Sequence, residues 1–172
     1  IGGVSILSKE RLLDELKKIS KLDTLEKLSK DKHSLDLILL IFPELKNIKI
    51  FSNLDLNKKK LLEKVDFIFY LSLLIIDESD NADYFLYKYN ISKKDQKRIK
   101  IIDNFFKEKI NLKTFDTTNI NKLFYYNGKE SVIDILTFKI IKSKKFDQII
   151  FDLINHYKNK PLPIMPIRAD VL

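Results

Sequence analysis

The chain has no cysteine and very few of the residues that make turns. The absence of cysteine rules out disulfide staples and thiolate metal sites, and it suits a reducing compartment. Its 172 residues include only three glycines and four prolines. All-β folds need many such residues at their turns, so this scarcity favours long helices. We expect a cytoplasmic, all-α protein.

Targeting and membrane signals are also missing. The opening residues lack the basic segment and the long apolar run of a signal peptide. The longest apolar stretch, 65–76, is interrupted by Asp66 and is too short to span a bilayer, so we expect no membrane partner. The chain begins with Ile1 and ends just after Asp170, which could start a further helix. We therefore expect a piece of a longer protein.

Residue patterns that carry catalysis are scarce. No Asp-x-Asp pair is present to hold two cations, and three glycines cannot build a phosphate-cradling loop. His33 and His156 are isolated, and neither is followed by Asp as in a His-Asp metal dyad. We expect no catalytic residue, no metal site and no cofactor within this sequence.

The charge is strongly basic, at +8 with a pI near 9.4. Such a surface attracts polyanions, nucleic acid first. Almost all of the basic residues are lysines, and Ile, Lys and Asn are abundant while Ala is rare. An AT-rich genome would impose the same bias on any surface, so a functional origin and codon bias both remain open.

Residues typical of helix starts and helix ends occur along the whole chain. Ser8 is expected to cap a first helix, and Phe42-Pro43 should end a helix over 35–41 because a residue before proline leaves the α region. Asn57 should open a long central helix reaching residue 76. Ser92 with Asp95 predicts a capping box, and Asn127-Gly128 predicts a helix end.

The apolar spacing of these segments predicts an irregular all-α bundle. We expect residues 1–160 to form one helical body and 161–172 an extended lead-in to a truncated tail helix, since three prolines fall within it. The side chains expected in the core include Leu39, Leu62, Ile68 and Ile102.

Several short motifs resemble, in order, the C-terminal helical half of bacterial class II tRNA nucleotidyltransferases and poly(A) polymerases. The first is Leu-Ser-Lys-Glu-Arg-Leu at 7–12, similar to the helix that follows the family's neck. Phe-Pro-Glu-Leu at 42–45, Ile-Ser-Lys-Lys-Asp at 91–95 and the helix-glycine step at 123–129 follow. The last is Pro-Leu-Pro-Ile with Arg-Ala-Asp-Val-Leu, at 161–164 and 168–172. The family's glycine in that last motif is replaced here by Ile167 or Arg168.

The resemblance implies an RNA-gripping body whose catalytic head and neck lie outside this sequence. The family's head uses Mg²⁺ with ATP or CTP to extend RNA 3′ ends, and its neck selects the nucleotide. Asp95 to Arg98 imitates part of the neck's signature, but its position in the chain favours a capping Asp on a solvated basic helix. Whether the parent completes CCA ends or makes poly(A) tails stays open.

A body that holds tRNA or another RNA needs lysines for phosphates, because A-form helices are recognised by backbone and shape. The candidate RNA-binding residues are Lys93, Lys94, Lys97, Arg98, Lys100, Lys139, Lys142, Lys144 and Lys145. The aromatic residues at 84–89 and 124–126 could stack on unpaired bases, although their helical spacing also fits a core. The alternative is a helical protein-interaction scaffold with no nucleic-acid role, which predicts an exposed apolar groove instead of a coherent positive face. The oligomeric state stays open.

Overall fold

The computed structural model describes residues 2–108 and 117–160, and the side chains among them from Ser8 and from Ile120 onward. These residues contain nine α-helices and one short 3-10 helix and no strand, which confirms the all-α prediction. The chain divides into two compact units, Ile1–Lys107 and Glu108–Leu172. The lead-in expected at 161–172 lies outside the described residues.

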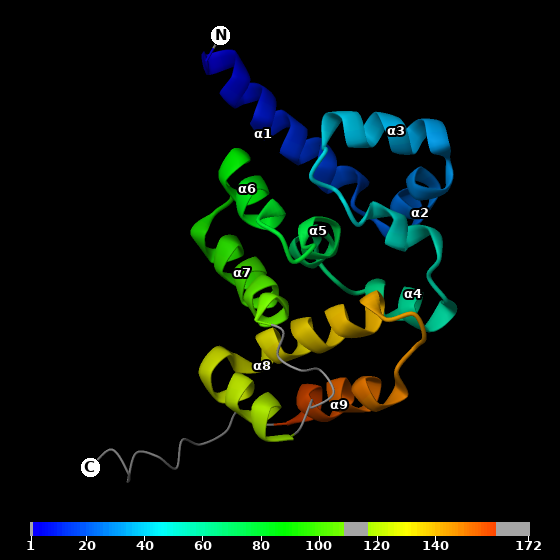
Figure 1. Ribbon diagram of the computed structural model, residues 1–172, viewed down its shortest axis with the longest axis vertical. Helices are drawn as coiled ribbons and strands as arrows, with labels where there is room; N and C mark the ends of the chain where they lie inside the picture. Colours follow the sequence, from blue (N-terminus) through cyan, green and yellow to red (C-terminus); the bar gives the residue numbers. More distant parts are fainter. Residues whose placement is uncertain (1, 109–116, 161–172) are drawn as a thin grey trace, which may run out of the picture. The chain divides into compact units, whose positions relative to one another are not determined.

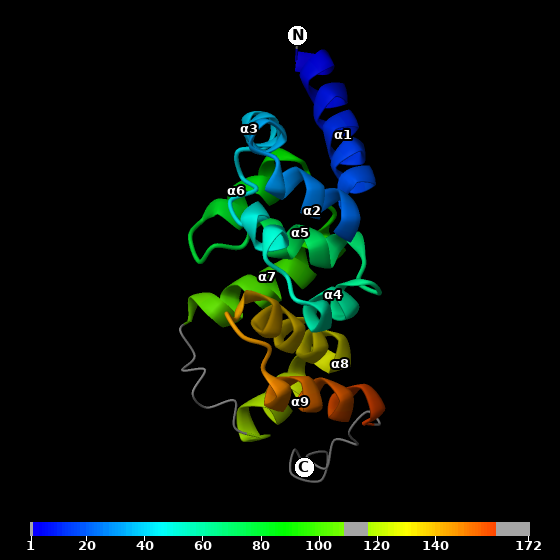
Figure 2. The same ribbon diagram turned by 90° about the vertical axis from the view of Figure 1, so that its right-hand side faces the viewer.

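The first unit holds seven α-helices and the 3-10 helix η1 (Figure 1). Their bounds are α1 (Gly2–Ile19), α2 (Leu22–Lys30), α3 (Lys32–Ile41), η1 (Ile48–Ser52), α4 (Leu56–Leu62), α5 (Phe67–Ile75), α6 (Asn81–Lys88) and α7 (Lys93–Lys107). The first turns of α1 extend beyond the other helices of this unit (Figures 1 and 2).

Aspartates start three of these helices. The carboxylates of Asp31, Asp55 and Asp66 accept hydrogen bonds from backbone N–H groups three residues later, at 3.0, 2.8 and 3.1 Å. Ser92 does the same for α7, because its hydroxyl accepts from the Asp95 N–H at 3.3 Å and donates to the Asp95 carboxylate at 3.0 Å. The predicted cap at Ser92 is therefore confirmed, and Asp95 joins it through the Ser92 hydroxyl.

Helix α5 is the centre of the first unit. Every residue from Phe69 to Ile75 is buried, and α5 packs against both α6 and α7. Helix α2 packs against α3 and η1, and the buried Leu25, Ile48 and Phe51 lie on these elements. A helix that is apolar on nearly all sides belongs in the interior, which is why α5 takes this place.

Two asparagines satisfy the carbonyl groups at the end of α5. The Asn81 amide donates to the Ile75 carbonyl at 2.8 Å and to the Glu44 carbonyl at 2.7 Å. The Asn47 backbone N–H donates to the Leu74 carbonyl at 3.1 Å, and its side-chain amide donates to the Ile76 carbonyl. The last carbonyls of a helix lack partners within the helix, so these bonds join the end of α5 to the 42–48 loop.

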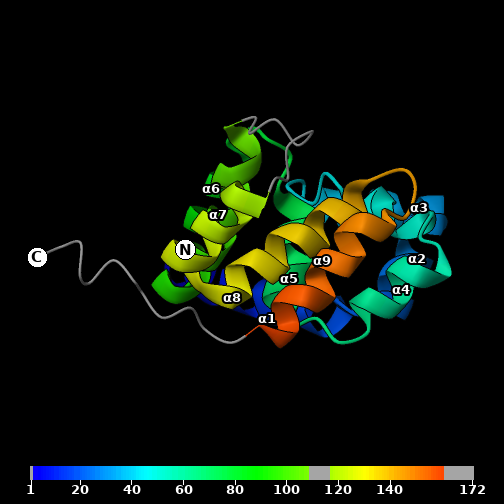
Figure 3. The same cartoon turned by 90° about the horizontal axis from the view of Figure 1, so that it is seen from below.

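The second unit is built from α8 (Thr117–Lys142) and α9 (Gln148–Asn159), which pack against each other (Figure 3). Helix α8 consists of two segments that meet at Gly128, where φ is 87° and ψ is 172°. Glycine adopts a positive φ without steric penalty, so the predicted helix break at Asn127-Gly128 is confirmed.

Packing of α9 onto the first segment of α8 centres on Tyr157. Its hydroxyl donates to the Asn121 side-chain oxygen at 2.7 Å, and its ring lies 5.4 Å from that of Phe124. The Lys160 ammonium reaches the same Asn121 oxygen at 3.2 Å and lies 5.5 Å from the Phe124 ring centre. This cluster joins the end of α9 to the start of α8.

Three sequence predictions are corrected. Helix α1 already begins at Gly2, so Ser8 lies inside it rather than capping it. The helix predicted from Asn57 to 76 is two helices, because Asp66 caps a new one. In the core, Leu62 and Ile102 are fully buried as predicted, but Leu39 and Ile68 are only partly buried. The predicted end of α3 before Phe42-Pro43 is confirmed.

Candidate functional site

The first half of α7 presents lysines to solvent. Lys93, Lys97 and Lys100 are spaced by four and three residues, so they lie on one face of the helix, with Lys94 beside them. All four are exposed. No ion pair with another described residue is formed by Lys93, Lys94 or Lys97. We call these four residues the α7 lysine face.

The position of these charges is unfavourable for the isolated helix. The N-terminal end of an α-helix carries partial positive charge, so cations in its first turns reduce helix stability. Lys93, Lys94 and Lys97 occupy this end of α7, and only Asp95 is acidic there. An anion bound to the lysines would remove the repulsion.

Arg98, also predicted to contact RNA, is engaged within the protein. Its guanidinium lies 2.5 Å from the carboxylate of Asp66, the residue that caps α5. Burial alone would raise the pKa of Asp66, but the hydrogen bonds from Arg98 and the Phe69 N–H lower it below its ordinary value. This pair connects the starts of α5 and α7.

Lys100 and Lys107 lie among carboxylates. Lys100 pairs with Asp83 of α6 at 3.4 Å, and Lys107 lies 3.5 Å from Asp83, 3.8 Å from Asp80 and 3.1 Å from Asp103. Asp103 is completely buried, and burial raises its pKa. These contacts bind α6 to α7, so Lys100 would have to exchange a carboxylate for a phosphate.

The second group of predicted RNA contacts lies in the other unit. Lys139 is partly buried on α8, and Lys142 is exposed with its ammonium 5.9 Å from the Phe138 ring centre. Lys144 and Lys145 are exposed in the turn between α8 and α9. A contact of any of these lysines with RNA stays a prediction.

Helix α6 separates its aromatic residues into an inner and an outer set. Phe85 and Tyr89 are buried, with ring centres 4.5 Å apart, and belong to the core. Tyr84 is 58% exposed and Tyr87 is 86% exposed on the opposite face. In the second unit Phe124 is buried, whereas Tyr126 is 78% exposed.

The Phe-Pro-Glu-Leu segment after α3 has a structural role. The Glu44 side chain is buried and its carboxylate lies 2.7 Å from the Lys88 ammonium of α6. The Lys88 ammonium also lies 5.9 Å and 5.4 Å from the ring centres of Tyr84 and Tyr89. The charge of Lys88 is thus neutralised within the protein, unlike the charges of Lys93, Lys94 and Lys97.

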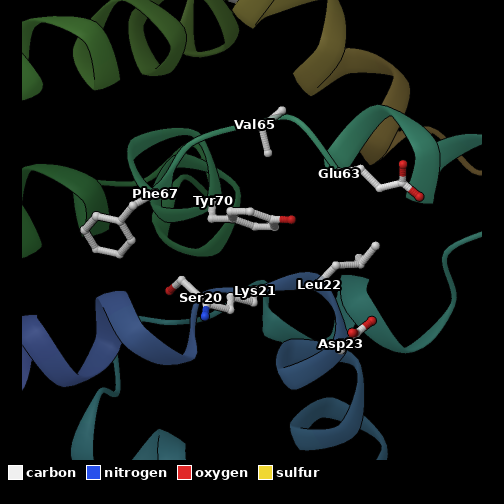
Figure 4. A pocket seen from close by; sticks show the side chains of 8 residues that line it. All are labelled: Ser20, Lys21, Leu22, Asp23, Glu63, Val65, Phe67 and Tyr70. Carbon is white, nitrogen blue, oxygen red and sulfur yellow. The ribbon is translucent and has the colours of Figure 1, made fainter.

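A hollow of about 410 Å³ opens between the start of α2 and the segment joining α4 to α5 (Figure 4). The Tyr70 hydroxyl on its wall donates to the Leu62 carbonyl at 2.8 Å. Burial, with the charges of Asp23 and Glu63, raises the pKa of Tyr70. The lining carries two carboxylates, those of Asp23 and Glu63, and one lysine, Lys21, so its charge does not favour a phosphate.

A second hollow, of about 370 Å³, lies beside the start of α7, and its lining includes three carboxylates, those of Asp14, Asp66 and Asp95, and one lysine, Lys17. Asp66 is paired with Arg98, and the other two carboxylates outnumber Lys17, so the charge of this hollow favours a phosphate less than the outward lysines of α7 do. The sequence did not reveal this acidic neighbour, since Asp14 and Asp66 come from helices distant in the chain.

Within the described residues, no group of three or more His, Asp or Glu side chains could hold a metal ion. No helix in the described part of the chain has the length and apolar character needed to cross a bilayer. Comparisons with models of protein families, with curated proteins and with solved structures found no match to this chain.

Proposed function

We propose that this chain is the RNA-binding helical part of a protein that adds nucleotides to the 3′ ends of tRNA or other RNA. The observation that carries the proposal is the α7 lysine face, where Lys93, Lys94 and Lys97 stand exposed and without a carboxylate partner among the described residues. The ordered motifs that resemble class II tRNA nucleotidyltransferases support it, as does the all-α fold. Nucleotide addition, with Mg²⁺ and ATP or CTP, would be carried out by residues outside this sequence.

The lysines would act by neutralising phosphates. Binding to successive phosphates releases the cations condensed on the RNA, so affinity decreases steeply as salt is added. Such contacts position RNA without reading its sequence. We expect a tRNA dissociation constant in the non-specific range, about 10⁻⁴–10⁻⁶ M.

The test compares two triple variants in tRNA binding between about 50 and 200 mM salt, followed by fluorescence anisotropy. Reversing Lys93, Lys94 and Lys97 to Glu should weaken binding and reduce the slope of log affinity against log salt by about 2–3. The control reverses three other exposed lysines of the same unit and therefore has the same net charge: Lys27, Lys32 and Lys49.

The control variant should bind tRNA more tightly than the α7 variant. Equal losses in the two variants would show that only net charge matters and that α7 has no special role. No tRNA binding by the unmodified chain at the lowest salt would refute the proposal.

One observation favours the alternative, a protein-interaction scaffold. Helix α3 exposes three apolar side chains on one face, Leu37 at 48%, Leu40 at 80% and Ile41 at 47%. Contiguous exposed apolar surface is typical of protein contact sites. If tRNA does not bind, this face of α3 becomes the better guide to function.

A further inference from the structure

Tyr87 and Tyr84 of α6 face solvent, whereas Phe85 on the same helix is buried. They lie three residues apart, so the two rings are neighbours on the outer face of the helix. Tyr87 projects directly away from the buried side formed by Ala82, Phe85 and Tyr89, which accounts for its 86% exposure. Neither hydroxyl makes a hydrogen bond with a described residue.

The ion pairs between α6 and α7 show which lysines lie beside Tyr87. Asp83, near the start of α6, contacts Lys100 and Lys107 in the second half of α7. Four residues join the end of α6 to the start of α7, so the two helices run back along each other. Tyr87 is one turn after Asp83, so helix geometry places it near the level of Lys100, with Lys97 about one turn farther along α7.

Helical spacing orders the side chains on this surface. Around α6, Asp83 faces α7, Tyr87 comes next, and Tyr84 lies farther away beside Lys88. The exposed ring of Tyr87 is thus placed between the α7 lysine face and the ring of Tyr84.

This arrangement combines the two elements that hold single-stranded nucleic acid. Lysines bind the phosphates, and flat aromatic rings stack on bases. A base can reach a protein ring only if it is unpaired, since a duplex keeps its bases inside. An RNA duplex could use the lysines but not the tyrosines.

We propose that Tyr87, flanked by Tyr84, is a stacking platform for unpaired bases of an RNA strand whose phosphates are bound by the α7 lysine face. This inference rests on the proposed RNA-binding function and names its substrate more narrowly, as single-stranded RNA or the unpaired end of a structured RNA. It predicts that removing the ring weakens binding of single strands and leaves binding of duplexes unchanged.

The chain contains no tryptophan, which allows a direct test. Tyr87→Trp introduces a single indole, whose fluorescence is quenched when a base stacks on it. The probes are an unstructured oligouridylate of about 12 nucleotides and an RNA duplex of about 12 base pairs, lengths that fit a single-strand site. Quenching by the oligouridylate and not by the duplex is expected.

Affinity measurements give the second readout. Tyr87→Ala should weaken oligouridylate binding about 5- to 150-fold, the range that loss of one base–aromatic stack produces. Tyr87→Phe keeps the ring and should bind like the unmodified chain. Tyr126 offers a matched control at 78% exposure in the other unit, so Tyr126→Ala should have little effect and Tyr126→Trp should not be quenched. Circular dichroism verifies that each variant is folded.

The outcomes separate this inference from the proposed function. If RNA binds but Tyr87→Ala affects single strand and duplex equally, or neither, the platform is refuted while RNA binding stands. Equal effects at Tyr87 and Tyr126 would also refute it. If the unmodified chain binds neither probe at low salt, both the RNA-binding function and the platform fall.

Discussion

Asn81 should contribute far more to stability than an ordinary polar residue, because its one amide satisfies two carbonyl groups. Asn81 is 9% exposed, and its side-chain amide donates to the carbonyls of Glu44 and Ile75. Each buried carbonyl left without a partner costs about 1–3 kcal/mol. Water entering the space left by the side chain would recover part of this, so we expect Asn81→Ala to reduce the free energy of unfolding by about 2–4 kcal/mol.

Asn81→Asp is a more specific test of the two hydrogen bonds that the Asn81 amide donates. Aspartate has nearly the same shape, but its carboxylate donates no hydrogen bond and would place negative charge against two carbonyl oxygens. At neutral pH this variant should be less stable than Asn81→Ala although it leaves no cavity. Acidification should narrow the difference, since a protonated carboxyl group can donate to one of the carbonyls.

Urea unfolding, monitored by circular dichroism, measures the loss of unfolding free energy in the Ala and Asp variants. Hydrogen exchange over residues 67–76 shows whether the destabilisation is located at the end of α5. Asn104→Ala is the control, because Asn104 is exposed on α7 and its replacement should change stability by no more than about 0.5 kcal/mol. A loss below about 0.5 kcal/mol for Asn81→Ala, or an Asp variant more stable than the Ala variant, would refute the reasoning.

Three further changes probe other parts of the structure. Gly128→Ala should destabilise the second unit by about 1–3 kcal/mol through backbone strain alone, since its φ is 87° and no atom lies within 4 Å of an added Cβ; an unchanged thermal midpoint would contradict this. Lys88→Met should cost about 3–5 kcal/mol in urea titrations by leaving Glu44 buried without its partner, and adding Glu44→Gln should restore part of the loss. The lowered pKa of Asp66 means that its pairing with Arg98 stabilises the fold above the unfolded-state pKa and is lost as pH falls through the folded-state pKa. Asp66→Asn keeps a capping side chain, so it should make stability less sensitive to acidification below about pH 4; equal acid sensitivity would exclude this contribution.

Local signals in the sequence predicted the helices well where a cap or a break depends on neighbouring residues. Ser92 with Asp95, Phe42-Pro43 and Asn127-Gly128 all act within one turn, and the structure confirms each of them. The predicted start of α1 was wrong because a serine such as Ser8 can lie either at a helix cap or inside a helix. The predicted single helix from Asn57 was wrong because the apolar run on both sides of Asp66 concealed the boundary between α4 and α5.

The candidate site was harder to predict because its character depends on contacts between distant residues. Charge spacing identified the lysines of α7, but it could not show that Arg98 pairs with Asp66 or that Lys100 pairs with Asp83. Helical spacing likewise could not show which face of α6 is buried and which of its aromatic residues are exposed. Only the packing of α6 against α5 and α7 determines that Phe85 is buried while Tyr87 is exposed.

The junction of the two α8 segments at Gly128 is also a site of chemical degradation. Asn127 is exposed and precedes a glycine, so no side chain hinders attack of the following backbone nitrogen on its amide carbon. That attack closes a succinimide ring with release of ammonia, and hydrolysis opens the ring to aspartate or isoaspartate. The isoaspartate form lengthens the backbone at the point where the two segments of α8 meet and adds a negative charge. Stored samples should therefore develop acidic variants that are modified at Asn127, beside the junction of the two α8 segments.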